Sequence, residues 1–366
     1  MTYRYHNPVA IEFGAQSIGE LRATLGGRRA ALVTFPEARD LGLVDRLQSV
    51  LGASLVHVEE HVQPNPDVQE LGAMYESFWR DCSESEAIVA LGGGSAIDTA
   101  KVLMVGTQTG HLDELISVLE TGRSFTPNRV KALIAVPTTA GTGSEVTPWA
   151  TVWDRASGRK HSLHLRQTWP EAAIVDPELM LTLPASVTLP SGLDALSHAL
   201  EAIWNVNANP ISDTFAVAAA RGVLATLPAL MAAPQDLELR SAMALAALQA
   251  GLAFSNTKTA LAHSISYEMT LRHGLTHGLA CSFTLPMILD RVIGLDPRRD
   301  ALFSAIFDGD LASAPQRLSR FLGDLGVRTE FADYGVSDEE SARMVRDALD
   351  GVRGRNFFAA AAWSRG

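Results

Sequence analysis

Cysteine, basic charge and long apolar runs are all scarce in this chain of 366 residues, and each shortage excludes a class of protein. Its two cysteines, Cys82 and Cys281, stand far apart and cannot form a disulfide framework, so we expect a reducing, cytoplasmic setting. The 30 basic residues are outnumbered by 41 acidic ones, giving a net charge of −11. Nucleic acid is therefore not expected as the main partner, because phosphate binding needs a basic face.

The most apolar stretches, residues 215–233 and 241–254, are interrupted by Arg221, Pro228 and Gln249. Neither contains about 18 consecutive apolar residues, so we expect buried helices and no membrane partner. The opening segment MTYRYHNPVAIEFG lacks the apolar region of a signal peptide. With 47% hydrophobic and 19% charged residues, the composition is typical of a folded globular protein.

The first half alternates short β-branched runs with amphipathic stretches. The runs that predict strands are 30–35, 54–60, 87–93 and 132–139, and the stretches between them that predict helices are 38–51, 66–81 and 95–106. Apolar strands separated by helices predict a parallel sheet covered on both faces, a Rossmann-like α/β fold. Residues 151–154 and 159–165 are expected to form a hairpin, and 172–177 one more strand.

The second half is rich in Ala and Leu at helical spacing, which predicts an all-helical domain. We interpret Pro190, Gly192, Pro210 and Pro228 as helix punctuation, and the prolines within 181–192 as framing a linker. The predicted division is a dinucleotide-binding domain over 1–184 and a metal- and substrate-binding domain over 185–366. Ligands are expected in a cleft between the two domains.

The segment 87–101 predicts a buried strand, a triple glycine and the start of a helix. Gly92, Gly93 and Gly94 allow close approach to a phosphate, and Ser95 adds a donor at the positive end of the helix. The pattern lacks G-x-G-x-x-G and the ending of a P-loop, so a simple tight turn is the alternative.

A second polar loop follows the next predicted strand. It contains Thr138, Thr139, Thr142, Ser144 and Thr147 around two glycines. A solvated loop is the alternative, but two such loops at the carboxyl ends of successive strands favour a dinucleotide site.

An aspartate and several histidines lie in the helical half. Asp194 and His198, four residues apart, share a helix face, and His263, His273 and His277 follow one another closely in the sequence. Capping and core hydrogen bonding are the alternatives for each residue alone. Together the residues predict a catalytic site for Fe²⁺ or Zn²⁺, because these cations accept nitrogen and oxygen ligands.

These motifs, in this order, resemble the iron-containing (group III) alcohol dehydrogenases over nearly the whole chain. The matching segments are PNP (64–66), GGGSAIDTAK, PTTAGTGSE, DPELMLTLP (176–184), GLDALSHALEA and the pair His263 and His277. The resemblance implies the metal ligands Asp194, His198, His263 and His277, and a homodimer or larger oligomer. It implies a pyrophosphate loop at Gly92, Gly93, Gly94 and Ser95 with Asp98 behind it, and a nicotinamide-side loop at Thr138, Thr139, Thr142, Ser144 and Thr147. It also implies Asn65 near the adenosine and Lys160 near the nicotinamide.

Two positions depart from the family pattern. Tyr267 stands where many members have a proton-relaying histidine, so Tyr267 and His273 become the catalytic candidates. Phe35 stands where many NAD-preferring members have an acidic residue, so the cofactor is expected to be NAD or NADP.

Residues 256–286 look more specifically like phosphonoacetaldehyde reductases. Lys258 and Arg272 flank the expected ligands and suit an anionic substrate; surface charge is the alternative. The predicted function is thus reduction of a small aldehyde, with phosphonoacetaldehyde favoured. The alternatives are a glycerol or polyol dehydrogenase, a lyase of the dehydroquinate-synthase type that uses NAD and zinc, a metallohydrolase, or a non-enzymatic dinucleotide sensor.

Overall fold

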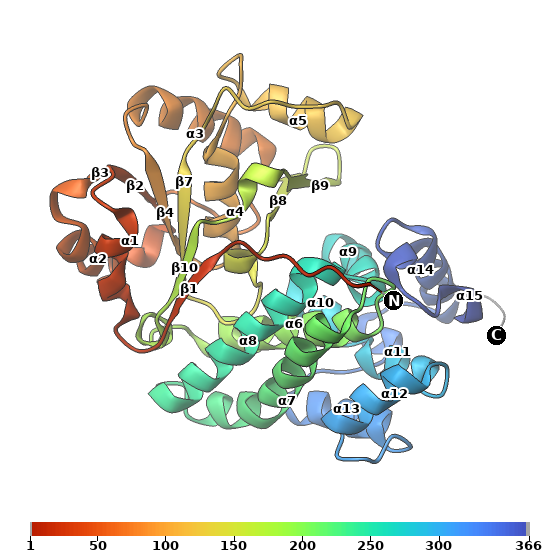
Figure 1. Ribbon diagram of the computed structural model, residues 1–366. Helices are drawn as coiled ribbons and strands as arrows, with labels where there is room; N and C mark the ends of the chain where they lie inside the picture. Colours follow the sequence, from red (N-terminus) through yellow and green to blue (C-terminus); the bar gives the residue numbers. More distant parts are fainter. Residues whose placement is uncertain (1, 364–366) are drawn as a thin grey trace. The chain divides into compact units, whose positions relative to one another are not determined.

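A computed structural model describes residues 2–363 of the chain, which form two compact units. We call residues 8–139 and 144–183 the α/β unit, and residues 2–7, 140–143 and 184–363 the helical unit (Figure 1). Tyr5 Oη donates a hydrogen bond to the carbonyl of Leu252 at 3.0 Å, which ties the first residues to the helical unit. The assignment of separate functions to residues 1–184 and 185–366 stays a prediction.

A six-stranded parallel sheet forms the centre of the α/β unit, as predicted. In spatial order its strands are β1 (Ala10–Phe13), β10 (Ala172–Val175), β7 (Ala132–Pro137), β4 (Ala87–Gly92), β2 (Ala30–Val33) and β3 (Leu55–Glu59). The short edge strand β1 was not predicted from the sequence, because its exposed residues lack the apolar run of the buried strands.

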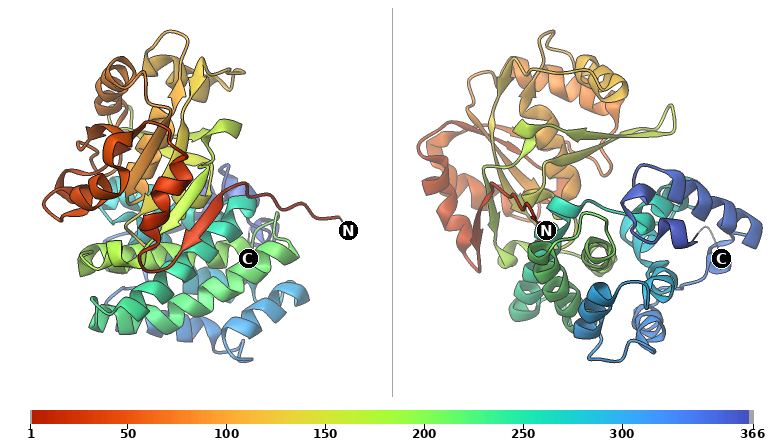
Figure 2. Two further views of the ribbon diagram at one scale, coloured as in Figure 1. Left: turned by 60° about the vertical axis from the view of Figure 1, so that its left-hand side comes forward. Right: turned by 45° about the vertical axis from the view of Figure 1, so that its right-hand side comes forward.

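Helices cover both faces of this sheet (Figure 2). One face packs against α1 (Leu21–Leu25) and α2 (Leu43–Leu51). The other packs against α3 (Val68–Asp81), α4 (Gly94–Leu103) and α5 (Leu112–Thr121). Successive strand residues point to opposite faces, so burial of both faces explains the continuous apolar runs.

The predicted hairpin forms from β8 (Trp149–Asp154) and β9 (Arg159–His164), which pair antiparallel. A second antiparallel pair, β5 (Val105–Gly106) and β6 (Arg129–Val130), was not predicted from the sequence because each strand has two residues. Short 3₁₀ turns lie between the main elements of the chain: η1 (Ser17–Glu20), η2 (Pro36–Ala38), η3 (Gly52–Ser54), η4 (Ser144–Val146), η5 (Arg166–Thr168), η6 (Pro177–Met180), η7 (Phe331–Tyr334) and η8 (Gly354–Asn356).

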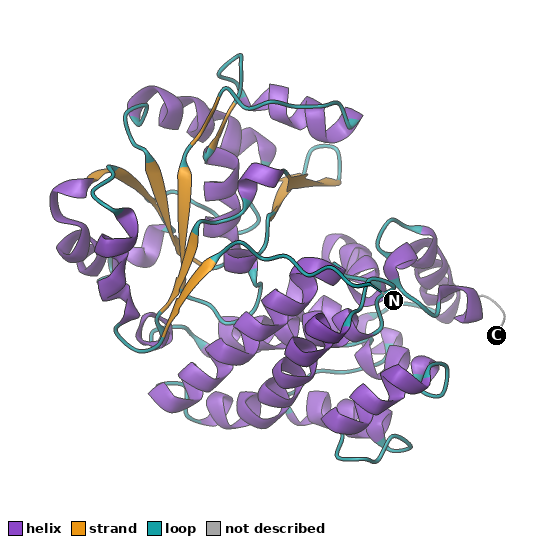
Figure 3. Ribbon diagram, in the orientation of Figure 1, coloured by secondary structure: helices purple, strands orange, loops and turns teal. Residues whose placement is uncertain are grey.

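The other unit is built from helices, as predicted (Figure 3). They are α6 (Ala185–Ile203), α7 (Pro210–Ala232), α8 (Leu237–Thr257), α9 (Leu261–His273), α10 (His277–Ser282), α11 (Leu285–Val292), α12 (Pro297–Ile306), α13 (Ala314–Asp324), α14 (Asp338–Asp350) and α15 (Ala360–Trp363). Two of them, α7 and α8, have the length and hydropathy of membrane spans, with 39% and 56% of the relevant windows buried. Both contribute residues to one apolar core together with α6.

Pro210 begins α7 as predicted, but Pro190 and Pro228 do not separate helices. Pro190 lies inside α6 and Pro228 inside α7, and α6 begins at Ala185, so residues 185–192 are helix and not a linker. Each of these prolines lies within two turns of a helix end and removes one backbone hydrogen bond of its helix. Gly192 is a packing position, since a Cβ there would lie 2.7 Å from Leu227 Cδ1.

Candidate metal centre and cofactor loops

Three helices of the helical unit bring the predicted ligands together. Asp194 and His198 lie on α6, His263 lies in the first turn of α9, and His277 begins α10. The Nε2 atoms of His263, His198 and His277 lie 3.4, 3.7 and 3.9 Å from Oδ1 of Asp194. Three imidazoles therefore surround one carboxylate oxygen.

One member of this cluster was not predicted from the sequence. Ligand atoms of Asp194, His263, His277 and Cys281 all lie within 4.8 Å of one another. His198 is outside that set of four, and its ring stacks on Phe254 at 4.0 Å between centroids.

The donor atoms fit a divalent cation. Oδ1 of Asp194 and Nε2 of His263 are buried and have no hydrogen-bond partner among residues 2–363. Each unsatisfied buried polar atom costs about 1–3 kcal/mol, so a cation between them would remove a real penalty. Nitrogen, carboxylate and sulfur donors suit Fe²⁺ or Zn²⁺ and suit Mg²⁺ or Ca²⁺ poorly.

The electrostatics of Asp194 and His198 favour the states that ligands need. Burial would raise the pKa of Asp194, but the neighbouring His198, His263 and His277 hold it below its ordinary value. Burial lowers the pKa of His198 to about 4, so this imidazole is neutral near pH 7. An ionised carboxylate and a neutral imidazole are the metal-binding forms.

The close approach of α10 to α6 depends on Gly278. A Cβ on this residue would lie 1.9 Å from the carbonyl oxygen of Pro190, one turn before Asp194. Gly141 has a similar role, because its Cβ would lie 2.5 Å from the carbonyl oxygen of Ser191. These two glycines therefore allow their segments to pack closely against α6.

Glu201 holds His263 in place and was not singled out in the sequence. Its Oε2 accepts hydrogen bonds from Nδ1 of His263 at 2.7 Å and from the backbone N–H of Ala260 at 2.8 Å, and its Oε1 accepts one from the backbone N–H of His263 at 3.2 Å. A proton fixed on Nδ1 leaves the Nε2 lone pair directed at Asp194. The signal in the sequence was the spacing of seven residues from Asp194, which puts Glu201 near the same face of α6.

We expect Glu201→Gln to weaken metal binding about 10–100-fold, because the amide nitrogen cannot accept the hydrogen bonds that the lost carboxylate oxygen accepted. Competition with a chromophoric chelator would measure the affinity. Glu238→Gln, an exposed glutamate on α8, is the matched control and should bind metal normally. Equal affinities for the two variants would show that Glu201 does not orient the ligand.

The two polar loops lie at adjacent carboxyl ends of the sheet, as predicted. Strands β4 and β7 pair in parallel up to Gly92 and Pro137, so the triple glycine lies beside Thr138 and Thr139. Gly92 has φ of 148° and a Cβ there would lie 2.7 Å from Ala96 Cβ, so only glycine fits. The strand order reverses between β2 and β4, where ligands bind in doubly wound sheets.

The described structure joins Asn65 to the glycine loop. The backbone N–H of Asn65 donates to Oγ of Ser95, in the first turn of α4, at 3.1 Å. Asn65 itself has φ of 57°, a left-handed conformation that asparagine tolerates better than most residues. Two segments that are separate in the sequence thus form one polar rim at the start of α4.

The other residues of the predicted cofactor site, apart from Thr142, belong to the α/β unit. Asp98 accepts hydrogen bonds from Oγ of Ser144 at 2.6 Å and from the backbone N–H of Thr151 at 2.8 Å. Thr147 is 2% exposed. Nζ of Lys160 lies 5.0 Å from the ring centroid of Trp153, and Thr142 belongs to the helical unit. Contacts of these residues with a cofactor stay predictions.

Comparison with known proteins assigns the family. The family model described as "Iron-containing alcohol dehydrogenase" matches residues 8–177, and that of the C-terminal region, "Fe-containing alcohol dehydrogenase family, C-terminal", matches residues 188–362. This chain belongs to the iron-containing alcohol dehydrogenase family. The resemblance in the motifs is thereby confirmed, and so is the fold.

Three relatives of this dehydrogenase show the range of the family. The "NAD-dependent methanol dehydrogenase" of Bacillus methanolicus is 31% identical, with 92% of this chain and 90% of that protein covered. The "Sulfoacetaldehyde reductase" of Bilophila wadsworthia is 29% identical, with 92% and 87% covered. The crystal structure of sulfoacetaldehyde reductase from Bifidobacterium kashiwanohense in complex with NAD+ is 30% identical, with a TM-score of 0.88 and 100% and 98% covered.

The predicted relay residues of this dehydrogenase lie at different distances from the metal cluster. Tyr267 follows His263 by one turn of α9, and the guanidinium carbon of Arg353 lies 4.7 Å from its ring centroid. His273 ends α9 about 15 Å from His263 along the helix axis, at about 1.5 Å per residue, and its Nε2 lies 3.6 Å from Oε1 of Glu340. Tyr267 is thus one turn of α9 from a predicted ligand, whereas His273 lies beside Glu340 of α14.

The two predicted anion-binding residues lie at opposite ends of α9. Lys258 is exposed and precedes the turn that contains His263. Arg272 is exposed near the far end, and its Nη1 lies 2.8 Å from Oε1 of Glu268. The two cations are not brought together.

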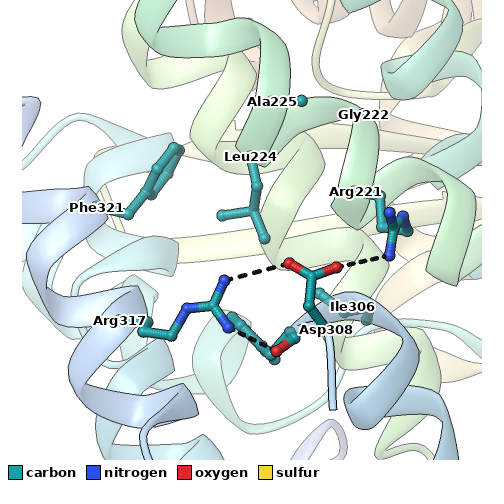
Figure 4. A pocket seen from close by; sticks show the side chains of 9 residues that line it. Arg221, Gly222, Leu224, Ala225, Ile306, Asp308, Arg317 and Phe321 are labelled. Atoms are coloured by element: carbon teal, nitrogen blue, oxygen red, sulfur yellow. Dashed lines mark hydrogen bonds and ion pairs between the residues drawn. The ribbon is translucent and has the colours of Figure 1, made fainter. Parts of the chain in front are cut away.

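A surface pocket of the helical unit lies away from all predicted site residues in sequence. Arg221, Asp308 and Arg317 line it and are joined by ion pairs (Figure 4). Both arginines donate hydrogen bonds to the carboxylate of Asp308 and to backbone carbonyls. We assign no ligand to this pocket.

Proposed function

We propose that this chain is a metal-dependent, NAD- or NADP-linked alcohol dehydrogenase or aldehyde reductase that acts on a small anionic aldehyde. The observation that supports it most is the convergence of three Nε2 atoms on Oδ1 of Asp194, within a family of alcohol dehydrogenases. Fe²⁺ or Zn²⁺ held by Asp194, His198, His263 and His277 would polarise a carbonyl and stabilise the alkoxide by several kcal/mol.

The α/β unit would hold the dinucleotide through Gly93, Gly94 and Ser95. The free backbone N–H groups at the start of α4 carry the positive end of the helix dipole, which favours a pyrophosphate. NAD is supported by the names of two relatives, an NAD-dependent enzyme and an NAD+ complex. Phe35 follows β2 and has no carboxylate that would repel the extra phosphate of NADP, so the proposal includes both cofactors.

We infer that protonation of the product alkoxide uses water or Tyr267. Tyr267 shares a face of α9 with His263, since residues four apart are neighbours on a helix. His273 is a weaker candidate, because α9 separates it from His263 by about 15 Å.

We assign the binding of the substrate's anionic group to the cationic side chains of Arg353 and Lys258, near the start of α9. Arg353 lies over Tyr267, and its Nε donates to Oγ1 of Thr259 at 3.0 Å. Lys258 precedes Thr259 directly. Arg272 is partnered by Glu268, which makes it the poorest of the three as an anion ligand. Two relatives named as sulfoacetaldehyde reductases support an anionic two-carbon aldehyde, and we favour phosphonoacetaldehyde reduced to 2-hydroxyethylphosphonate.

A substrate panel tests this proposal. The enzyme, reconstituted with Fe²⁺ or Zn²⁺, should reduce phosphonoacetaldehyde or sulfoacetaldehyde with a higher kcat/KM than propanal, using NADH or NADPH. Arg353→Gln should raise KM for the anionic aldehydes about tenfold or more, because a charge-assisted hydrogen bond contributes about 1.5–3 kcal/mol. It should leave KM for propanal nearly unchanged.

The control for the anion site is Arg328→Gln, an exposed arginine beyond α13. Preference for propanal over both anions would contradict the anionic substrate and favour a general alcohol dehydrogenase. Aldehyde consumption without oxidation of NAD(P)H would contradict the reductase and favour the lyase or hydrolase alternative. A cytoplasmic location and a homodimer or larger oligomer remain predictions.

A further inference from the structure

Cys281 lies inside the metal cluster without a role in the mechanism above. It is fully buried, and it follows His277 by four residues on α10, so both side chains lie on one face of that helix. Its Sγ lies 3.6 and 3.7 Å from the two ring nitrogens of His277 and within 4.8 Å of the donor atoms of Asp194 and His263. The thiol thus belongs to the same set of neighbouring donor atoms as three of the predicted ligands.

A second, independent observation indicates that the space between these side chains suits a cation. Asp194 and His263 are 3% and 4% exposed, and the atoms they direct into the cluster, Oδ1 and Nε2, lack hydrogen-bond partners among residues 2–363. An aliphatic residue at position 281 would offer this cluster no donor atom, whereas the sulfur adds one.

We propose that Cys281 is a metal ligand of this chain, so that its site offers one carboxylate, three imidazoles and one thiolate. This inference rests on the proposed metal-dependent function. The site then offers five donor atoms to a cation that commonly takes four ligands. Asp194, His263, His277 and Cys281 have donor atoms within 4.8 Å of one another, and His198 does not belong to that set. Cys281 and His198 would therefore compete for the fourth ligand position.

The sulfur would change which metal the site prefers. Thiolate is a soft ligand that favours Zn²⁺ over Mg²⁺ or Mn²⁺, while imidazole and carboxylate alone serve Fe²⁺ and Zn²⁺ alike. We therefore expect Cys281→Ser to weaken Zn²⁺ binding about tenfold or more, and to weaken Fe²⁺ binding less. The variant then has a lower ratio of zinc to iron affinity than the unchanged protein.

Cobalt substitution tests the ligand directly. In the unchanged protein, one equivalent of Co²⁺ should produce a near-ultraviolet sulfur-to-cobalt charge-transfer band, and Cys281→Ser should lose that band. The chain has two cysteines, so Cys82→Ala is the matched control: Cys82 is buried in the α/β unit, and its removal should leave the band intact. X-ray absorption of the zinc-loaded, unchanged protein should show one sulfur at about 2.3 Å, which requires no variant to fold.

The possible failures are distinguishable. If Co²⁺ binds with one equivalent but no charge-transfer band appears, and zinc shows only nitrogen and oxygen neighbours, Cys281 is not a ligand and the metal-dependent function stands. If neither cobalt nor zinc binds, both proposals fail. A band that survives in Cys281→Ser and disappears in Cys82→Ala would also overturn the assignment.

Discussion

Replacing Asp194 with asparagine should empty the metal site and lower kcat/KM for aldehyde reduction about a thousandfold or more. The oxygen on which three imidazoles converge loses its negative charge, and an amide is a poor metal ligand. Loss of the cation removes several kcal/mol of transition-state stabilisation, and the rate falls tenfold for each loss of about 1.4 kcal/mol. Metal content by mass spectrometry and steady-state kinetics measure the two effects.

Asp290→Asn is the matched control for this variant. Asp290 is an exposed carboxylate on α11, so its replacement should leave metal content and kcat/KM unchanged. An Asp194→Asn protein that remains active without metal would refute the metal assignment. His277→Ala should give the same result as Asp194→Asn, with an empty site and no turnover, because it removes one of the three imidazoles.

Adding one methyl group at Gly278, which is not itself a ligand, should disrupt the metal site. In Gly278→Ala the new Cβ would lie 1.9 Å from the carbonyl oxygen of Pro190; this oxygen is a backbone atom, and the position of the Cβ is fixed by the backbone of residue 278, so neither can move aside cheaply. Overpacking of this kind costs about 1–3 kcal/mol of folding stability. Because His277 adjoins Gly278 and Asp194 follows Pro190 by one turn, we also expect weaker metal binding, measured by chelator competition.

Gly323→Ala separates this effect from a general effect of glycine substitution. Gly323 lies inside α13, where a Cβ would meet no atom within 4 Å, so alanine should leave stability unchanged or raise it by about 0.5–1 kcal/mol. Urea denaturation of the two variants gives the comparison. Equal stabilities and unchanged metal affinity for both would show that α10 does not depend on close contact at Gly278.

Local sequence patterns were sufficient to predict an element where one physical cause dominates. The apolar runs of β2, β4 and β7 predicted strands because burial on both faces of a sheet allows few polar side chains. The spacing of Asp194 and His198 predicted a shared helix face for the same geometric reason that holds for any α-helix. The helix breaks predicted at Pro190 and Pro228 do not occur, because each proline lies within two turns of a helix end and removes one backbone hydrogen bond of the helix.

The sequence alone predicted the α/β sheet, the helical half, the family and the four residues Asp194, His198, His263 and His277 that the structure brings together, because periodicity and motif spacing are local properties. Only the tertiary structure decided that Cys281 lies among the ligands, that Glu201 orients His263 and that His273 turns toward Glu340. These outcomes depend on which faces of α6, α9, α10 and α14 pack together. Such contacts join residues that are far apart in the sequence, and no single helix pattern contains that information.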